Sequence, residues 1–313
     1  MQMYLWSGYS GGAKLDSSFD SGVIAHEYCH GLSIRLTGGP STSSCLSGEQ
    51  AGEGWSDFCA LFVTATSSTG LTRAIGAYVY ANRNGLRPKP YSPDFSINPY
   101  TYGQAKNLSN PHGIGFFFAS CLWDLYLGMV QLYGYGEDKY NPNSGGNTKT
   151  FQLVVQGLKN QVCTPDFVES RDAIILADQQ LYGGANVCLI WGVFARRGLG
   201  LNAVGGYVED FDVPPGCNNL RCVQFWGGTP VAPPPDYTYT KITGCTDNPI
   251  GWYDSDGPTY NCAWYGAVST RCSTYGGSYP NFGKTAKQAC CVCGGGTGTS
   301  QVVTVTLTCG SST

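Results

Sequence analysis

Two histidines and a glutamate in this sequence are spaced in a way that suggests metal chemistry. His26, Glu27 and His30 form the pattern His-Glu-x-x-His. Residues four apart lie one turn apart on the same face of a helix, so both imidazoles can reach one zinc ion at about 2.0–2.1 Å. Glu27 projects beside them, where its carboxylate can act as a general base toward a water on the metal. Because the chain has only three histidines, a chance match would be rare.

A pair of acidic residues further along the chain offers a third ligand. Glu53 and Asp57 are four residues apart and would share one face of a second helix. A catalytic zinc needs three protein ligands and an open position, a role that suits Glu53. Asp57 can accept a hydrogen bond from the other ring nitrogen of a ligand histidine and so fix its tautomer. Acidic pairs at this spacing also occur on solvated helix faces, and that alternative stays open.

The third histidine, His112, comes directly before a long apolar stretch. At the start of a helix it could face a cleft and stabilise a developing oxyanion. A cap or a surface position is the alternative. The apolar stretch itself, 113–130, contains Ser120 and Asp124 and is only just long enough for a bilayer. We therefore interpret it as a buried helix and expect no membrane span.

Apolar residues at helical spacing predict several helices to position these groups. Asp20 or Ser21 would cap the first of them, which carries the two histidines of the motif. Residues that end helices agree with the predicted limits; for example, Gly183 and Gly184 follow the predicted helix over 166–181. The predicted helices cover roughly 20–36, 49–66, 113–133, 150–160, 166–181 and 186–197.

The sequence divides at a proline- and glycine-rich stretch. We expect a mostly helical zinc domain over 1–226, a linker over 227–240, a cysteine-rich module over 241–295 and a tail over 296–313. The module is rich in glycine and has little apolar periodicity, as in small disulfide-stapled domains. The predicted fold class is thus a mainly α catalytic domain followed by a small disulfide-rich irregular module. Sequence does not choose among the possible pairings of its six cysteines, Cys245, Cys262, Cys272, Cys290, Cys291 and Cys293.

The composition restricts the class of protein. A hydrophobic content of 42% excludes an intrinsically disordered chain, and a net charge of −3 gives no basic footprint for nucleic acid or anionic membrane. Fifteen cysteines are unusual in a reducing compartment and favour a secreted, extracellular protein, although no signal peptide is visible at the start of the sequence.

Aromatic residues in the module leave two interpretations open. Trp252, Tyr253, Trp264 and Tyr265 could stack on carbohydrate if they are exposed. In so small a domain they more often form the core.

The stretch from His26 to Pro40, followed by Gly52 to Phe58, resembles the fungalysin family of secreted zinc metalloendopeptidases, which are thermolysin-like gluzincins. Further similarity extends over about residues 1–212. The resemblance implies the helical lobe of such an enzyme, acting on protein or peptide substrates with one catalytic zinc. It implies His26, His30 and Glu53 as zinc ligands, Glu27 as general base and His112 as the residue that stabilises the tetrahedral intermediate. We leave Tyr91, in a similar stretch, outside the catalytic set, because a tyrosine in a proline-rich loop is more often simple packing.

Two departures from the family pattern produce further expectations. Only 25 residues precede His26, so by the family pattern we expect most of an N-terminal lobe to be missing from this chain. The alternative function is therefore a catalytically impaired fragment or pseudopeptidase that acts as an extracellular binding or interaction protein. Cys29 and Cys59 replace non-cysteine residues of the family pattern, and we hypothesise a bridge between them. A role for Cys29 as a fourth ligand is disfavoured, because it points about 60° from His26 and about 100° from His30.

Overall fold

The computed structural model describes residues 3–7, 11–12, 14–41, 44–46, 49, 51–214, 217, 237–249, 251–257, 260–267 and 270–307. The chain forms two compact units. The first comprises Met1–Leu201 and Phe211–Pro234, and the second comprises Asn202–Asp210 and Pro235–Thr313. The predicted linker lies mostly outside the described residues, and the predicted domain boundaries stay a prediction.

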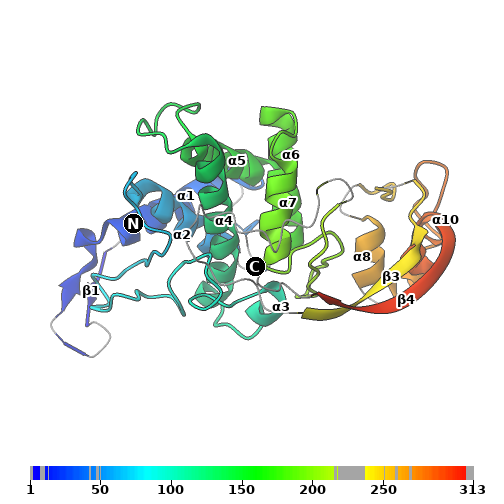
Figure 1. Ribbon diagram of the computed structural model, residues 1–313, viewed down its shortest axis with the longest axis horizontal. Helices are drawn as coiled ribbons and strands as arrows, with labels where there is room; N and C mark the ends of the chain where they lie inside the picture. The colour runs from blue at the N-terminus through cyan, green and yellow to red at the C-terminus, as the bar shows by residue number, and fades with distance from the viewer. Residues whose placement is uncertain are drawn as a thin grey trace, which may run out of the picture. The chain divides into compact units, whose positions relative to one another are not determined.

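The first unit is built from helices, as the periodicity predicted (Figure 1). A short antiparallel pair, β1 (Leu5–Trp6) with β2 (Leu15–Asp16), and a 3₁₀ turn at Ser17–Phe19 precede the helices. The helices are α1 (Ser21–Leu36), α2 (Ala51–Thr64), α3 (Tyr102–Ala105), α4 (His112–Tyr133), α5 (Gly146–Asn160), α6 (Phe167–Tyr182) and α7 (Val187–Arg196). The mainly α class of this part of the chain is confirmed.

Helix α4 forms the centre of the core. Every residue from Gly113 to Met129 is buried. Within the described residues, α4 is the only helix long and apolar enough to cross a membrane, and 94% of its most apolar window is buried inside the protein. Such burial is typical of a core helix. The aromatic side chains Phe116, Phe117 and Phe118 are fully buried, and Phe118 stacks on Phe167 at the start of α6.

A buried ion pair anchors the long irregular segment between α2 and α3 to this core. Asp124 of α4 accepts a hydrogen bond of 2.6 Å from Nε of Arg197, and both side chains are fully buried. The Arg197 guanidinium also donates to the carbonyls of Ser92, Asn98 and Tyr100. Backbone oxygens and one carboxylate thus compensate the buried charge. These bonds fix the irregular stretch that follows α2.

Three disulfides staple the described part of the first unit: Cys29–Cys59, Cys45–Cys163 and Cys188–Cys217. The hypothesised Cys29–Cys59 bridge is confirmed, and Cys29 is therefore no metal ligand. Cys121 on α4 is a free, buried thiol.

The second unit is small and stapled, as expected. Strand β3 (Tyr237–Thr246) pairs antiparallel with β4 (Thr297–Leu307), so strand residues extend into both the predicted linker and the predicted tail. Short helices α8 (Cys262–Ala267), α9 (Arg271–Thr274) and α10 (Ala286–Ala289) and a 3₁₀ turn at Cys291–Cys293 complete it. The six cysteines pair as Cys245–Cys291, Cys262–Cys290 and Cys272–Cys293.

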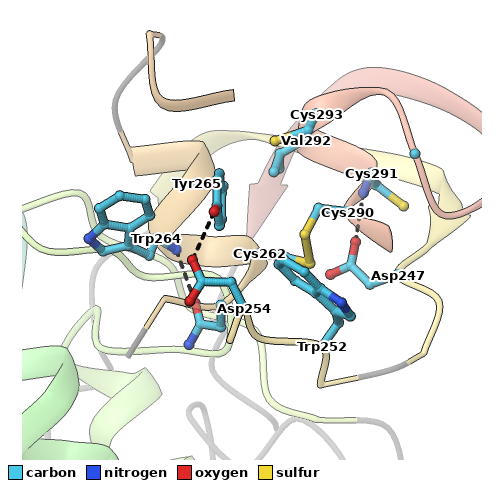
Figure 2. Close-up of a disulfide and its surroundings, with 12 residues drawn as sticks. Asp247, Trp252, Asp254, Cys262, Trp264, Tyr265, Cys290, Cys291, Val292 and Cys293 are labelled. Carbon is cyan, nitrogen blue, oxygen red and sulfur yellow. Dashed lines mark hydrogen bonds between the residues drawn. A yellow bond between two sulfur atoms is a disulfide. The ribbon is translucent and has the colours of Figure 1, made fainter. Parts of the chain in front are cut away.

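Two of the four aromatics considered for carbohydrate stacking are core residues instead (Figure 2). Trp252 and Tyr265 are each 1% exposed and pack beside the Cys262–Cys290 bond. The Tyr265 hydroxyl donates to the buried carboxylate of Asp254 at 2.8 Å. A module this small has little apolar surface to bury, so its largest rings form the core. Carbohydrate contact by this module stays a prediction.

Candidate metal centre

Helix α1 begins at a well-formed cap that sets the position of the histidines along it. The Asp20 carboxylate accepts hydrogen bonds from the backbone N–H groups of Gly22 at 3.0 Å and Val23 at 3.2 Å. This is the predicted cap, and it satisfies N–H groups that have no partner within the helix. The buried face of α1 includes Val23, His26 and Cys29, at the spacing of one helical stripe. His26 therefore points inward, with 7% of its side chain exposed, compared with 27% for His30.

The side chains of His26, His30 and Glu53 converge on one point. The two Nε2 atoms are 3.0 Å apart, Nε2 of His26 is 3.2 Å from Oε2 of Glu53, and Nε2 of His30 is 3.7 Å from Oε1 of Glu53. Ligands bound to zinc at about 2.0–2.1 Å in a tetrahedron are about 3.3 Å from one another. Among the described residues these three form the one group of histidine, cysteine or carboxylate side chains close enough to hold a metal ion.

The donor set also fits a cation chemically. Oε2 of Glu53 is buried and accepts no hydrogen bond of regular geometry among the described residues, although Nε2 of His26 lies 3.2 Å away. A cation at the shared point would compensate this buried carboxylate oxygen more fully. Two imidazole nitrogens and one carboxylate oxygen are the ligand types that zinc accepts in catalytic sites.

Close contact between two helix backbones places Glu53. A Cβ atom at Gly54 of α2 would lie 2.6 Å from the carbonyl oxygen of Gly115 on α4. A Cβ at Gly115 would in turn lie 2.8 Å from the Gly54 nitrogen and collide with Cβ of Glu53. Both positions therefore need glycine for α2 to approach α4 this closely. Glu53 sits at that crossing, so its backbone position is fixed by α4.

Asp57 lies behind His26 and is held on several sides. Its Oδ1 is 2.7 Å from Nδ1 of His26, the ring nitrogen that faces away from the metal position. Arg87 donates from Nε to Oδ2 at 2.6 Å and from Nη2 to Oδ1 at 2.7 Å, and the Tyr91 hydroxyl also donates to Oδ2. Asp57 is fully buried. The carboxylate thus contacts the His26 ring from the side opposite Glu53, and its role in orienting that ring stays a prediction.

The charges of this cluster shift its pKa values in opposite directions. Burial alone would lower the pKa of His26, but the contacts with Asp57 and Glu53 outweigh it and raise this pKa to about 9. Burial would raise the pKa of Asp57, but the Arg87 guanidinium and His26 hold it well below its usual range. The pKa of His30 is lowered, first by burial and then by the neighbouring His26. A metal that binds here must therefore displace a proton from His26.

The other two predicted catalytic residues lie at the edge of this cluster. Glu27 is exposed on α1, next to His26. His112 is the first residue of α4, and its half-exposed side chain places Nε2 3.6 Å from Oε1 of Glu53. A cleft of about 370 Å³ lies beside His112, and its lining includes His112, Ser109, Leu86 and Arg87 but not Glu27. The structure thus brings His112 to the proposed ligands although 59 residues separate it from Glu53 in sequence.

Sequence reasoning missed Arg87 and named no partner for the Tyr91 hydroxyl. Both come from the irregular segment after α2, where no periodicity indicates which side chains turn inward. Tyr91 is fully buried, and its hydroxyl is engaged by Asp57, which agrees with its exclusion from the catalytic set.

Comparisons with known proteins identify the family to which the chain belongs. The model of the family described as fungalysin metallopeptidase (M36) matches residues 1–203. The chain therefore belongs to the fungalysin metallopeptidase family, as its motifs suggested.

Curated relatives include an extracellular metalloproteinase MEP of Fusarium vanettenii, which is 42% identical over 69% of this chain and 36% of its own length. An extracellular metalloproteinase of Pyrenophora tritici-repentis is 42% identical over 70% of this chain and 36% of its own length. An extracellular metalloproteinase MEP of Pyricularia oryzae is 43% identical over 65% of this chain and 33% of its own length. The chain spans about a third of the length of these relatives.

Proposed function

We propose that this chain carries the metal-binding helices of a secreted, zinc-dependent endopeptidase, with His26, His30 and Glu53 as the zinc ligands. The observation that carries the proposal is the convergence of these three side chains, with Nε2 of His26 3.0 Å and 3.2 Å from its two neighbours. The family is one of metallopeptidases, which implies a catalytic metal. Disulfides and the extracellular relatives support secretion.

The roles of the residues follow from their places. Zinc held by the three ligands would act as a Lewis acid and lower the pKa of a water molecule toward 7. Glu27, exposed beside His26, takes a proton from the attacking water and passes it to the leaving amine of the peptide. His112 donates to the carbonyl oxygen as negative charge develops there. Asp57 keeps the His26 ring oriented from behind.

The general-base role is tested by Glu27→Gln in the full chain. We expect this variant to bind one zinc per chain, as the wild type does, but to lose hydrolysis of casein, because its amide cannot take up a proton. Glu137→Gln, which changes an exposed glutamate in the loop after α4, is the matched control and should keep wild-type hydrolysis. A chelator should abolish hydrolysis in the wild type and in the control.

Two results would contradict this assignment: loss of zinc from Glu27→Gln, or hydrolysis that persists in it. Zinc binding without hydrolysis in the wild type would instead favour the alternative function, an extracellular binding protein with the same metal centre.

A further inference from the structure

A disulfide joins the two helices that carry the proposed ligands. Cys29 lies between His26 and His30 on α1, and Cys59 lies on α2 after Glu53 and Asp57. The two Cα atoms are 6.3 Å apart, and each residue is 5% exposed. The bond is therefore buried in the interface of α1 and α2, beside the ligands but not among them.

The metal site depends on how these two helices pack. His26 and His30 keep their mutual distance because they belong to one helix. The distance of 3.2 Å between His26 and Glu53 depends instead on the placement of α2 against α1. Metal–ligand distances tolerate deviations of only about 0.2 Å. A small slide of one helix along the other would thus separate the third ligand from the first two.

Two different devices restrict that slide. On one side, the glycine contact between Gly54 and Gly115 fixes α2 against α4. On the other side, the Cys29–Cys59 bond ties α2 to α1 covalently. Packing against α4 alone does not set the distance from Glu53 to the histidines, because the histidines belong to α1. The cross-link acts on the one interface that the ligand set spans.

We propose that Cys29–Cys59 is a positioning cross-link for the metal site. It holds α1 against α2 in the metal-free protein, so that the three ligands stay close to their binding geometry. This inference rests on the proposed function, since it assumes a metal at these residues. The apparent dissociation constant of a ligand equals its intrinsic value divided by the fraction of protein in the competent conformation. Loss of the bond lowers that fraction and weakens zinc binding.

A second disulfide of the same unit provides a matched control. Cys29–Cys59 spans a sequence separation of 30, and Cys188–Cys217 spans 29. Removing either bond therefore relaxes the unfolded chain to nearly the same extent. Cys188 lies on α7 and Cys217 lies beyond it, so this bond joins neither α1 nor α2 to another segment.

The test measures zinc affinity of the metal-free full chain by competition with a chromophoric chelator. In the double variant Cys29→Ala/Cys59→Ala the zinc dissociation constant should rise about tenfold or more, as expected if the competent fraction falls to about a tenth. In Cys188→Ala/Cys217→Ala it should stay within about twofold of the wild-type value. Circular dichroism checks that each variant is folded. His30→Ala, which removes a proposed ligand, should abolish binding at this site.

Two affinity results overturn the proposal: an unchanged constant in Cys29→Ala/Cys59→Ala, or an equal weakening in both double variants. If the alanine variant does not fold, Cys29→Ala/Cys59→Val refills part of the lost volume and takes its place. Failure of both to fold, while the control folds, would make the bond a requirement of the fold and would also overturn the proposal.

The same experiment separates this inference from the proposed function. Wild-type protein that binds no zinc, or zinc binding that survives in His30→Ala, would contradict the metal site itself. Binding that is lost in His30→Ala but unchanged in Cys29→Ala/Cys59→Ala would contradict only the positioning role.

Discussion

Asp57 shows how a single carboxylate serves several neighbours at once. It is fully buried and contacts His26, Arg87 and Tyr91. The Arg87 guanidinium compensates the charge of Asp57 through a bidentate hydrogen-bonded contact. This contact also fixes the plane of the carboxylate. Oδ1 of the same carboxylate lies 2.7 Å from Nδ1 of His26. The charge of Asp57 therefore contributes both to the stability of the cluster and to the geometry of the proposed ligand.

The substitution Asp57→Asn keeps the size of the side chain but removes its charge. An amide cannot compensate the charge of Arg87 and can present the wrong atom to Nδ1 of His26. We expect zinc affinity, measured by chelator competition, to fall about 10–100-fold, the usual effect of losing a carboxylate behind a ligand histidine. Asp178→Asn is the matched control, because Asp178 is equally buried but contacts Asn186. Equal losses of affinity in both variants would show that the effect is not local to the site.

At the scale of elements, the close crossing of α2 and α4 leaves no room for a side chain at Gly115, beside Glu53. Gly115→Ala would place a methyl group 2.8 Å from the Gly54 nitrogen and force the two helices apart. We expect a loss of about 1–3 kcal/mol in the free energy of unfolding, measured with urea, as for other overpacked cores. Zinc affinity should fall in the same variant.

Gly128→Ala on the same helix tests whether any added methyl group has this effect. A Cβ there would lie 3.1 Å from Cδ1 of Leu189, the end of a flexible side chain. The neighbour can move, so the loss should be smaller than for Gly115→Ala. A loss as large as that of Gly115→Ala would contradict the account of the crossing.

The start of α6 carries a pH-dependent contribution to stability. The Glu169 carboxylate accepts a hydrogen bond from the Asp166 backbone N–H. In turn, the Asp166 carboxylate accepts a hydrogen bond from the Glu169 backbone N–H. Burial, with Asp166 nearby, raises the pKa of Glu169 from 4.5 to about 7. Between these two values the folded protein keeps a proton that the unfolded chain has released. The stability therefore falls as the pH rises through this range.

Glu169→Gln isolates this effect, because glutamine keeps the capping bond and carries no charge. The urea midpoint of the wild type should fall more between pH 5 and pH 8 than that of the variant. The same fall in both proteins would show that Glu169 does not titrate in this range.

At the scale of the whole chain, sequence periodicity predicted the helices well but not the segments between them. Helices α1, α2, α4, α6 and α7 begin and end within a few residues of the predicted limits, because their apolar residues are buried, on one face in α1 and on nearly all sides in α2 and α4. Helix α5 begins at Gly146 rather than near 150, because its first turn is Gly-Asn-Thr-Lys and has no apolar pattern. The long segment between α2 and α3 has no period at all.

The residues of the candidate site likewise divide into those that the sequence predicts and those that it does not. The motif of His26, Glu27 and His30 could be identified because its geometry is set within one helix. Glu53 followed from the number of ligands that a zinc needs, and Asp57 followed from its spacing of four residues from Glu53 on one helix face. Arg87 could not be found, because its contact with Asp57 depends on the path of an irregular segment. The pairs Cys45–Cys163 and Cys188–Cys217 could not be predicted either, because the positions of cysteines in a sequence do not say which of them lie close together in the fold.

The most direct test of the account is X-ray absorption spectroscopy of the zinc-loaded full chain, alongside its zinc content. One zinc per chain should be surrounded by two histidine nitrogens at about 2.0–2.1 Å and by oxygen, and the spectrum should change in Glu53→Gln. Sulfur at about 2.3 Å, or a spectrum that is the same in wild type and Glu53→Gln, would contradict a site formed by His26, His30 and Glu53.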